Sequence, residues 1–585
     1  MSAARTEIAA QHMLGGLFRA RGNDRHVADD LLNGTLRLDN HPAAAIDLAA
    51  PDWHANPFRD NNWQFSYHSL RWIDVLRRTY DATGEQQYLD AYTAVARSWH
   101  ETHTADPTAK VSRFAWYDMG AGLRVLILAG VLHTIGEDEW IVDCIAEHGR
   151  RMAPEDFGHQ IGNHIIHIHN GLITAGHIMG EPTWTEMATH RLKKLLLENV
   201  DLKGVADDGA IQYQINNYNW YKEALDHARA AGIHHGPEFD RVDLMPEFLA
   251  HAFQTNRVLV QFGDSDRTAV PRLSVPVLDY INSKGESGQR PDELYKVYEH
   301  AGYAFGRTHW DVEDMTDVLH YSLRFGPAQN AHTHAHQDGG SVTINYGGVE
   351  LHPEGGRYRY DTQPMSIYFK SQSTHNTVTF LADEFDPDAP TDLVSSWSSD
   401  RYETTVVRRE ERQGSVWQRA VVHDRPGRGI VVADHVRPHT HSETVQLWQL
   451  PAGAIVRTDD RNALIYLRGK HLATLAVAAS APLYFEVVEG RRSADHIEGW
   501  RSVKYGECFE APVLRIGVRA AEALIATSIL PNLPNYPGAV LNRGERTSAS
   551  SLCLGIERAA SSATVRFRVV DGLLTANIAQ EGAGA

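Results

Sequence analysis

The chain has 585 residues, of which 42% are hydrophobic and 22% are charged, a composition typical of globular proteins and not of disordered ones. Asp and Glu total 74 and Lys and Arg total 56, so the formal charge is −18. This acidic balance argues against general binding of nucleic acids or anionic membranes, which requires a basic surface, although a small cationic or metal-lined cleft could still hold an anionic substrate. At roughly 150 residues per domain, the length suggests two to four domains.

The three cysteines, Cys144, Cys508 and Cys553, lie far apart in the sequence and cannot form a disulfide framework or a cysteine-rich zinc module. The N-terminal segment lacks the continuous apolar stretch of a signal peptide. Apolar runs such as residues 125–132 are shorter than the roughly 20 residues that a bilayer span needs. We therefore expect a soluble, cytoplasmic protein with neither a membrane nor a nucleic acid as its partner.

Between about residue 5 and residue 260, apolar residues recur at helical spacing. In residues 69–84, for example, Leu70, Ile73 and Leu76 share one stripe, and Gly84 provides a good C-terminal stop. Further segments of this kind are residues 87–103, 119–136, 163–180, 183–199, 219–232 and 245–254. Serial helical hairpins of this length favour an α/α toroid or an open helical barrel.

After about residue 300 the pattern changes to short β-branched or aromatic runs separated by turn residues, such as residues 340–348 and 429–438. This pattern is typical of a large antiparallel sandwich of two stacked sheets. The turn-rich residues 282–293 mark the boundary. The sequence thus predicts an α+β multidomain protein, with an incomplete α/α toroid over residues 1–295 and an antiparallel β-sandwich over residues 296–585. Pockets are expected at the interface between the two domains.

The most unusual segment is AHTHAHQDGGSV at residues 331–342, in which His332, His334 and His336 alternate. Histidine is the side chain most readily used near neutral pH as an acid, a base or a metal ligand. In a chain with 33 histidines, surface or core positions explain such a cluster about equally well. The segment follows the expected domain boundary and precedes Asp338, which makes it a candidate for chemistry.

Two expected helix starts carry further candidates. Asn163 and His164 begin one helix; Asn163 suits the N-cap position, but an amide at the mouth of a helical barrel can also contact a ligand. In residues 207–225 a turn leads into a helix that carries Tyr218 and Tyr221. Aromatic residues here are more often packing than chemistry, yet a phenol near an anionic or metal-bound substrate can be tuned to transfer a proton.

Six segments, in the same order along the chain, resemble the heparinase II/III-like polysaccharide lyases, which combine an N-terminal α/α toroid with an antiparallel β-sandwich. They are GNHIIHIHNGL at 162–172, DDGAIQYQINNYNWY at 207–221, FGDSD at 262–266, GYAFGRTHW at 302–310, HAHQDGGSVTINYGGVELHPEGGRY at 334–358 and STHNTVTF at 373–380. The resemblance covers most of the chain. Its motifs are fairly specific for the superfamily but not for one substrate.

The resemblance implies a role for each matched residue. Asn163 and His164 would bind and neutralise the uronate carboxylate of the substrate. Tyr218 would be the proton donor, and in many members also the base, and His334 would be a second acid/base residue from the sandwich. The other substrate contacts are expected from Asn219, Tyr221 and His332.

The resemblance also implies a structural zinc ion, since His336 and His375 match positions that bind zinc in several members of the family. The third ligand there is an Asp, where this chain has Glu354 as the nearest carboxylate and His352 as the alternative. We expect no organic cofactor. The chain departs from the family pattern at three more positions: Asn219, where the family often has His, and Gln212 and Gln214, where some members have Glu.

Lyases of this family remove the C5 proton of a uronic acid and expel the oxygen at C4. Donors held against the carboxylate stabilise the enolate-like intermediate, and one such donor is worth about 10²–10³ in rate. Because Tyr218 and His334 lie in different expected domains, the cleft would form between those domains. With no signal peptide seen, imported oligosaccharides are the accessible substrates, so we expect an exo-acting or oligosaccharide-preferring lyase of acidic glycans. The oligomeric state is left open, a homodimer included.

Two alternatives remain open. A glycoside hydrolase on a similar toroid would use two carboxylates, Asp207 with Asp208 or Asp264 with Asp266, although carboxylates so close in sequence seldom flank a bond at the required separation. A non-catalytic carbohydrate-binding or metal-binding protein would use the HxHxD segment as a cupin-like site. Such a site usually has a Glu a few residues later, and here none occurs before Glu350.

Overall fold

The computed structural model describes residues 4–38, 41–104, 112–158, 164–493, 496–532, 540–542, 548–558 and 561–581. The chain forms two compact units. Unit 1 comprises Met1–Asn199 and Asn217–Val242, and unit 2 comprises Val200–Asn216 and Asp243–Ala585. The division falls inside helix α10, Ile211–Ala230, and the domain boundary predicted near residue 295 stays a prediction.

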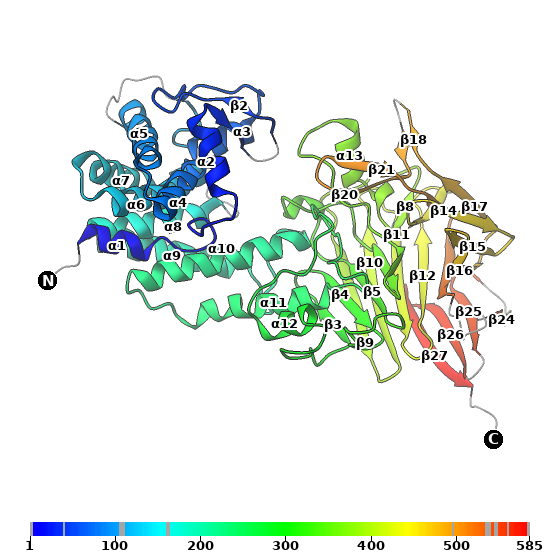
Figure 1. Ribbon diagram of the computed structural model, residues 1–585. Coiled ribbons are helices and arrows are strands. Elements are labelled where there is room, and N and C mark those ends of the chain that lie inside the picture. The colour runs from blue at the N-terminus through cyan, green and yellow to red at the C-terminus, as the bar shows by residue number, and fades with distance from the viewer. Residues whose placement is uncertain are drawn as a thin grey trace. The chain divides into compact units, whose positions relative to one another are not determined.

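Unit 1 is built almost entirely of helices (Figure 1). In chain order they are α1 (Arg5–Gln11), α2 (Asp24–Leu32), α3 (Asn61–His68), η1 (Arg71–Ile73), α4 (Asp74–Thr83), α5 (Gln86–His103), α6 (Asp118–Ile135), α7 (Glu139–Met152), α8 (His164–Met179), α9 (Pro182–Asn199), most of α10 and η2 (Pro237–Asp240). Two short strands, β1 (Thr35–Leu36) and β2 (Ala44–Ala45), pair beside them. The helices that the periodicity of the first half predicts are thus present.

Helix α6 is the apolar core helix of unit 1. By length and composition it could cross a membrane, but 78% of it is buried inside the structure, as expected of a helix that is hydrophobic on all sides. Helices α6 and α8 approach unusually closely, because a Cβ on Gly122 would overlap the carbonyl oxygen of His167, and Gly171 lies directly against Gly122. This contact holds α8, the helix that begins at His164, close against α6.

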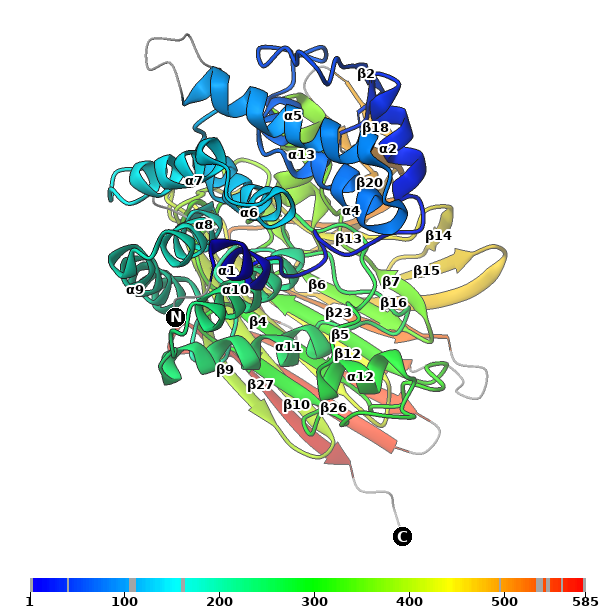
Figure 2. The same ribbon diagram turned by 60° about the vertical axis from the view of Figure 1, so that its left-hand side comes forward.

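Unit 2 contains all the other sheets of the described chain, which are antiparallel throughout. The five-stranded sheet has the order β3 (Tyr295–Tyr298), β4 (Tyr303–Arg307), β5 (Leu319–Arg324), β6 (Val342–Tyr346), β7 (Val349–His352). The eight-stranded sheet has the order β14 (Ala454–Thr458), β15 (Asn462–Leu467), β16 (Lys470–Ala479), β23 (Ala523–Pro531), β12 (Gly429–Arg437), β11 (Val416–Asp424), β10 (Tyr402–Glu410), β9 (Thr391–Ser398). Figure 2 shows its strands running side by side.

The smaller sheets and helices complete unit 2. One four-stranded sheet has the order β17 (Leu483–Val488), β22 (Val513–Arg519), β13 (Glu443–Gln449), β8 (Val378–Phe380), and the other runs β24 (Val540–Asn542), β25 (Ser551–Arg558), β26 (Ser561–Val570), β27 (Leu573–Glu581). The two-stranded sheets are β18 (Arg491–Arg492) with β19 (Ile497–Glu498) and β20 (Trp500–Lys504) with β21 (Glu507–Glu510). The helices are α11 (Arg241–His251, shared with unit 1), α12 (Pro276–Asn282), η3 (Gln329–Ala331), α13 (Pro364–Lys370) and η4 (Gln372–Thr374).

The eight-stranded sheet has apolar packing on both faces. Val421 and Val432, paired across β11 and β12, belong to a core that includes strands of the five-stranded sheet and of the β17–β22–β13–β8 sheet. Their neighbours Val422 and Val431 point the other way, into a core shared with β25–β27, which includes Phe567. The predicted sandwich is therefore present, and the C-terminal sheet adds a further layer.

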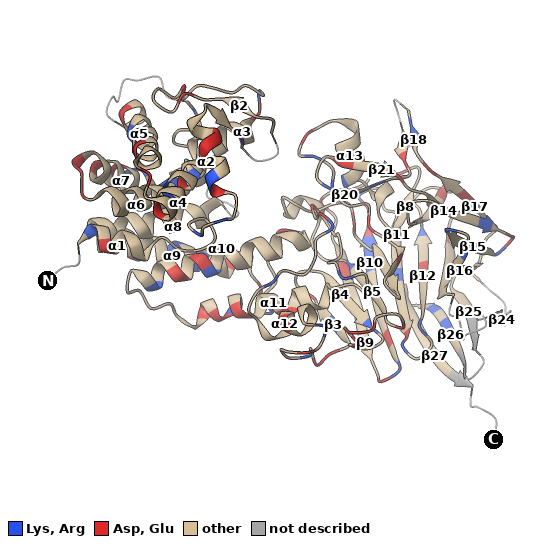
Figure 3. Cartoon of the chain, viewed as in Figure 1, with Lys and Arg blue, Asp and Glu red and all other residues tan. Residues whose placement is uncertain are grey.

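Charged residues of both signs occur on both units (Figure 3). Several of them are buried as pairs. In unit 2, Nε and Nη2 of Arg419 lie 2.8 Å from the two carboxylate oxygens of Asp434, and both side chains are fully buried. In unit 1, Arg78 bonds in the same bidentate manner to Asp24. Losing one partner of such a pair leaves an uncompensated buried charge.

Buried neutral histidines should make the fold acid-sensitive. Burial is the main cause that lowers the pKa to about 3 in His68, His169 and His251 and to about 4 in His103, His167 and His352. These values lie below the roughly 6.5 of an unfolded histidine. As the pH falls below 6.5, these histidines therefore bind protons in the unfolded chain but stay unprotonated in the folded chain. The free energy of unfolding decreases as a result.

His169 is the clearest test, since neither of its ring nitrogens has a hydrogen-bond partner among the described residues. His169→Leu is expected to remove about 1 kcal/mol of the loss in unfolding free energy between pH 7.5 and pH 5.5. Urea denaturation followed by tryptophan fluorescence measures this difference. The exposed His26→Leu should leave the pH dependence unchanged. Equal pH dependence in His169→Leu and the unmodified protein would contradict the assignment.

Candidate active site

The histidine segment lies in unit 2 between η3 and β6, and its side chains separate. His332 Nδ1 lies 3.1 Å from Oδ1 of Asp207. His334 Nδ1 lies 3.1 Å from Oδ2 of Asp264, and His336 Nε2 lies 3.0 Å from Oδ1 of the same carboxylate. The structure therefore brings two of the three predicted histidines to one aspartate of the FGDSD turn.

Three chain segments wind tightly around this aspartate. The backbone N–H of Asp264 donates to the carbonyl oxygen of His334 at 2.9 Å, and the N–H of His334 donates to that of Asp208 at 3.3 Å. Gly209 and Gly263 have φ of +74° and +61°, and a Cβ on Gly263 would overlap the carbonyl oxygen of Gly209. Only glycine suits both positions. The two glycines thus allow His334 to reach its partner.

Asp264 is an ionised carboxylate in a buried position, with 2% of its side chain exposed. Burial alone would raise its pKa, but hydrogen bonds from His334 and His336, a further electrostatic effect of His336 and the charge of Lys370, 3.3 Å away, keep the pKa well below its usual range. An ionised carboxylate can only accept hydrogen bonds. Nδ1 of His334 is therefore the nitrogen that donates, and Nε2 is left for proton exchange.

Two tyrosines that the sequence analysis did not select lie against His334. The ring of Tyr213 stacks on the imidazole with the centroids 3.6 Å apart, and the ring of Tyr360 lies 6.0 Å away at a steep angle. Their hydroxyls are 3.4 Å apart. Burial, with smaller effects of Tyr360 and Asp264, raises the pKa of Tyr213, so its phenol stays protonated. Tyr213 lies in the same DDGAIQY segment as the predicted site, which was the available signal.

Arg357 fixes the position of Tyr360. Its Nη1 donates to the Tyr360 hydroxyl at 2.6 Å, while Nε and Nη2 bond to the two carboxylate oxygens of Asp266 at 2.8 and 2.9 Å. Burial alone would lower the pKa of Arg357, but the hydrogen bond and charge of Asp266 raise it. The backbone N–H of Asp266 donates to the side-chain oxygen of Gln212 at 2.9 Å. Gln212 thus supports the turn that holds Arg357.

Gln214, the other glutamine at a position where some family members have Glu, is buried and bonds to the backbone. Its Nε2 donates to the carbonyl oxygens of Gly204 at 2.6 Å and Met245 at 3.1 Å, and its Oε1 accepts from the N–H of Ala206 at 2.8 Å. An amide suits this place because it can both donate and accept hydrogen bonds.

The residues predicted to bind the uronate belong to unit 1. Asn163 lies outside the described residues. His164 is the first residue of α8, and its Nδ1 lies 3.2 Å from both carboxylate oxygens of Asp118, the first residue of α6. The imidazole is 35% exposed, so it can reach a ligand while Asp118 orients it.

Helix α10 carries the predicted catalytic tyrosine. Tyr218 is 9% exposed, Tyr221 is buried, and Asn219 is exposed. Tyr218 belongs to unit 1 and His334 to unit 2. The predicted meeting of these two side chains across a shared groove therefore stays a prediction.

The predicted zinc ligands His336, His375 and Glu354 are neighbours in the interior of unit 2, although in the part of the chain that the structure describes their donor atoms do not all lie within 4.8 Å of one another. The rings of His336 and His375 are 5.5 Å apart, and the carboxylate of Glu354 bonds to His375 Nδ1 and to the hydroxyl of Ser341. His336 Nδ1 and His375 Nε2 are buried and have no hydrogen-bond partner in the described structure. Two imidazole nitrogens and a carboxylate are a donor set that suits zinc. His352, the alternative ligand, bonds instead to the carbonyl oxygen of Gln449 at 3.2 Å.

A second cluster was missed by the sequence analysis. Candidate ligand atoms of Glu247, His251 and Glu293 lie within 4.8 Å of one another. The ammonium group of Lys296 is 3.1 Å from Glu247 and also pairs with Glu293. Both hydrogen bonds raise the pKa of Lys296 against the opposing effect of burial. The lysine therefore offsets part of the charge of these two carboxylates.

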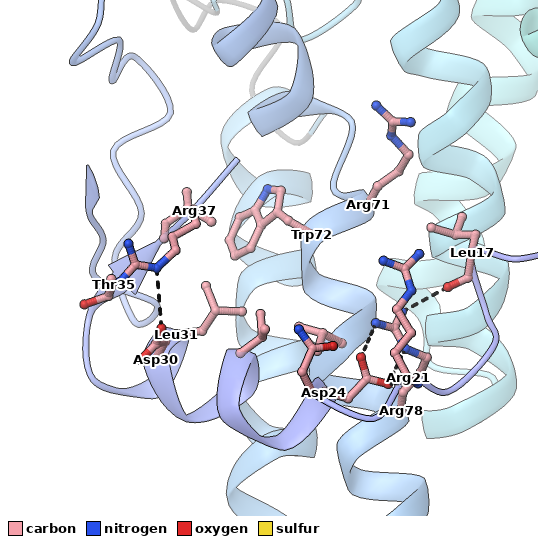
Figure 4. A pocket seen from close by; sticks show the side chains of 14 residues that line it. Leu17, Arg21, Asp24, Asp30, Leu31, Thr35, Arg37, Arg71, Trp72 and Arg78 are labelled. Atoms are coloured by element: carbon pink, nitrogen blue, oxygen red, sulfur yellow. Dashed lines mark hydrogen bonds and ion pairs between the residues drawn. The ribbon is translucent and has the colours of Figure 1, made fainter. Parts of the chain in front are cut away.

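Unit 1 has a pocket of about 250 Å³ between α2, η1 and α4 (Figure 4). Trp72 and Leu31 lie on its walls, and the arginines that line it are Arg21, Arg37, Arg71 and Arg78. Arg78 bonds to Asp24 and to the carbonyl oxygen of Leu17, and Arg37 lies 3.6 Å from Asp30. Much of the positive charge is thus cancelled within the wall, and the pocket contains none of the predicted site residues.

Comparison with known proteins gives the family. Residues 23–270 match the heparinase II/III N-terminus, and residues 290–513 match the heparinase II/III-like C-terminal region. The chain belongs to the heparinase II/III-like family. The resemblance stated from the six motifs is confirmed.

The family relatives include two named heparin-sulfate lyase. That of Bacteroides stercoris is 21% identical over 410 residues, covering 61% of this chain and 60% of the relative. That of Bacteroides thetaiotaomicron is 20% identical over 437 residues, covering 62% and 61%. The aligned region thus spans about three fifths of the length of these relatives.

Solved structures confirm the fold of this heparinase II/III-like chain. A crystal structure of heparinase III is 16% identical with a TM-score of 0.76, covering 96% of this chain and 95% of the other. The heparan sulfate lyase of Pedobacter heparinus is 14% identical with a TM-score of 0.72, covering 99% and 94%. The predicted toroid followed by an antiparallel β-sandwich is therefore correct.

The carboxylate of Asp264 should be essential for the stability of unit 2. Asp264→Ala is expected to lower the unfolding free energy by about 3–5 kcal/mol, because it leaves buried donors without their ionised acceptor. Asp392→Ala, a change on strand β9 with an exposed side chain, is the control and should change stability by less than about 0.5 kcal/mol. Thermal and urea denaturation measure both. Equal stability of the two variants would contradict the role given to Asp264.

Proposed function

We propose that this heparinase II/III-like protein is a lyase that cleaves a uronic-acid-containing glycan by β-elimination. Family membership and the fold shared with heparinase III support the proposal. The observation that carries it is the imidazole of His334, held at Nδ1 by the buried, ionised Asp264 so that Nε2 can exchange a proton. Two ordered aromatic rings, Tyr213 and Tyr360, line the same place.

In the proposed reaction the C5 proton of the uronate is removed and the bond from C4 to its oxygen breaks, which leaves a C4–C5 double bond. Asn163 and His164 would neutralise the uronate carboxylate, which makes the C5 proton more acidic. Tyr218 would protonate the leaving oxygen. His334 would serve as a second acid/base group, since a neutral Nε2 accepts a proton and a protonated one donates it.

We propose acidic glycans as the substrate class. Heparan-type chains are the first candidates, because the relatives are named heparin-sulfate lyase. The exo-acting preference expected from the sequence is part of the proposal. Comparing long heparan sulfate with its di- to tetrasaccharides tests it. Faster cleavage inside the polymer than at its ends would contradict exo action.

The glycoside hydrolase alternative fits the geometry less well. Its general acid must be protonated near neutral pH. Asp264 has a pKa well below its usual range, and Asp266 accepts two hydrogen bonds from Arg357. Both carboxylates are thus committed as charged acceptors. Asp207 is likewise 3.1 Å from His332.

We also propose one structural zinc ion bound by His336, His375 and Glu354. Its two histidines provide buried nitrogens that have no hydrogen-bond partner among the described residues, and its carboxylate is already oriented by Ser341. A bound zinc ion would stiffen the wall behind His334. The proton transfers would remain with His334 and Tyr218.

The catalytic assignments predict large losses of turnover. His334→Ala and Tyr218→Phe are each expected to lower kcat by about 10²–10⁴-fold, because each removes a positioned acid or base. Asp264→Asn keeps the shape but not the charge that orients the imidazole, and should lower kcat with little change in KM. The readout is ultraviolet absorbance of the unsaturated product from heparan sulfate. The exposed His300→Ala is the control.

A contrary result would be clear. Turnover of Tyr218→Phe and His334→Ala at the unmodified rate would remove both from the mechanism. Failure of the unmodified protein to release an unsaturated product from heparan sulfate, alginate and hyaluronate alike would refute the lyase proposal itself.

The zinc site predicts metal content. Plasma mass spectrometry of the dialysed protein is expected to find one zinc ion per chain, and His375→Ala should lose it. Glu247→Gln, in the cluster that pairs with Lys296, is the matched control and should keep the metal. Absence of bound zinc at micromolar free Zn²⁺ would rule the site out.

A further inference from the structure

The turn of the β20–β21 hairpin lies next to Tyr360. The ring centroids of Tyr360 and Tyr505 are 5.6 Å apart, and the backbone N–H of Tyr360 donates to the Tyr505 hydroxyl at 3.4 Å. The N–H of Gly506 donates to the carbonyl oxygen of Tyr358 at 2.8 Å. Figures 1 and 2 show α13 and this hairpin in the same part of unit 2. The hairpin tip is thus tied to residues 358–360.

These contacts extend the aromatic surface away from His334. Tyr213 stacks on the imidazole, Tyr360 follows at 6.0 Å from it, and Tyr505 comes next. Tyr360 is 48% exposed. Tyr213 and Tyr505 are half-buried. Rings with a polar tip suit ligands that are part apolar and part hydroxylated. The row therefore has the properties of a sugar-binding surface.

Two arginines lie beside this row, and only one of them is paired with a carboxylate. The guanidinium of Arg357 lies 5.5 Å from the Tyr360 centroid and 5.3 Å from that of Tyr505, but Asp266 neutralises it. Arg359 is exposed and lies over the ring of Tyr358 at 5.1 Å. Across the described chain its guanidinium makes no hydrogen bond or ion pair.

Arg359 also lies at the hairpin tip. Its Nε would be 3.6 Å from a Cβ built on Gly506, the residue after Tyr505. The nearby Asp361 accepts a hydrogen bond from the N–H of Gln363 at 3.0 Å, and the charge of Arg359 contributes to lowering the pKa of Asp361, but no ion pair within 4 Å joins the two described side chains. In a chain of net charge −18, this exposed cation beside Tyr360 is available to bind an anion.

We infer that Tyr360, Tyr505 and Arg359 form a subsite for the sugar next to the reacting uronate, in which Arg359 binds an anionic substituent, sulfate or carboxylate, of that sugar. The inference rests on the proposed function for the position of the reacting sugar. Tyr360 and Tyr505 provide the surface on which the sugar ring packs. Arg357 is a positioning residue, since it holds the Tyr360 hydroxyl.

Arg359→Ala is expected to raise KM for heparan sulfate about 10–100-fold and to leave kcat unchanged, because a charge-assisted hydrogen bond to the substrate is lost. If the substituent is a sulfate, chemically desulfated heparan should show no such rise. If it is a carboxylate, the rise should persist on desulfated heparan. Arg457→Ala is the matched control, since Arg457 is also exposed and lies 5.1 Å from a tyrosine ring, that of Tyr466.

The aromatic part is tested separately. Tyr505→Ala should raise KM on both polymers, and Tyr505→Phe, which keeps the ring but loses the hydroxyl, should raise KM less than Tyr505→Ala. Thermal unfolding of each variant verifies that the hairpin is intact. An unchanged KM in both Arg359→Ala and Tyr505→Ala would overturn the subsite while leaving the lyase proposal standing.

Calorimetric binding of a heparan sulfate tetrasaccharide to the His334→Ala variant, with and without Arg359→Ala, needs no turnover. A Kd weakened about 10-fold or more by Arg359→Ala supports the subsite, and an equal Kd refutes it. If the unmodified protein gives no unsaturated product, the proposed function fails, and this comparison still decides whether Arg359 binds the glycan.

Discussion

The carboxylate of Asp264 organises the candidate active site. It accepts from His334 on one oxygen and from His336 on the other, and the ammonium group of Lys370 adds a positive charge. A buried carboxylate is costly unless such donors surround it. The same arrangement that stabilises the charge also fixes the orientation of the imidazole, so the stability of this turn and the geometry of the site cannot be separated.

One side chain also links the site to the proposed zinc ligands. His336 gives Nε2 to Asp264, and its Nδ1 is directed elsewhere, without a partner among the described residues. Its ring neighbours His375, which Glu354 orients. Charge of Glu354 raises the pKa of His375 although burial acts in the opposite sense. A cation bound among these residues would thus act on Asp264 through a single imidazole, that of His336.

The sequence predicted the architecture well, because both periodicities are strong. Residues such as Val421 and Val422 alternate between two cores, and apolar helices such as α6 repeat through the first half. It also selected His334 and His336 as candidate site residues. It could not predict that both meet Asp264, because that contact depends on two glycine turns, at Gly209 and Gly263, whose approach is set by tertiary packing.

Tyr360, Arg357 and Arg359 were missed for a related reason. They lie at or just beyond the end of a recognised block, in a loop with no periodicity, and their neighbour Tyr505 is about 145 residues away in sequence. A local pattern cannot reveal a pairing of that range. Tyr213 is different, since it stood in a segment already selected, beside the tyrosine that the family pattern favoured.

The double-sided packing of the eight-stranded sheet has a consequence for the far end of the chain. The family match ends at residue 513, yet Phe567 and Leu574 cover the face formed by Val422, Val431 and Ala433. A chain truncated after the matched region would present that apolar face to water, where it would invite self-association. Sequence outside the recognisable family region thus covers an apolar face of the recognisable part.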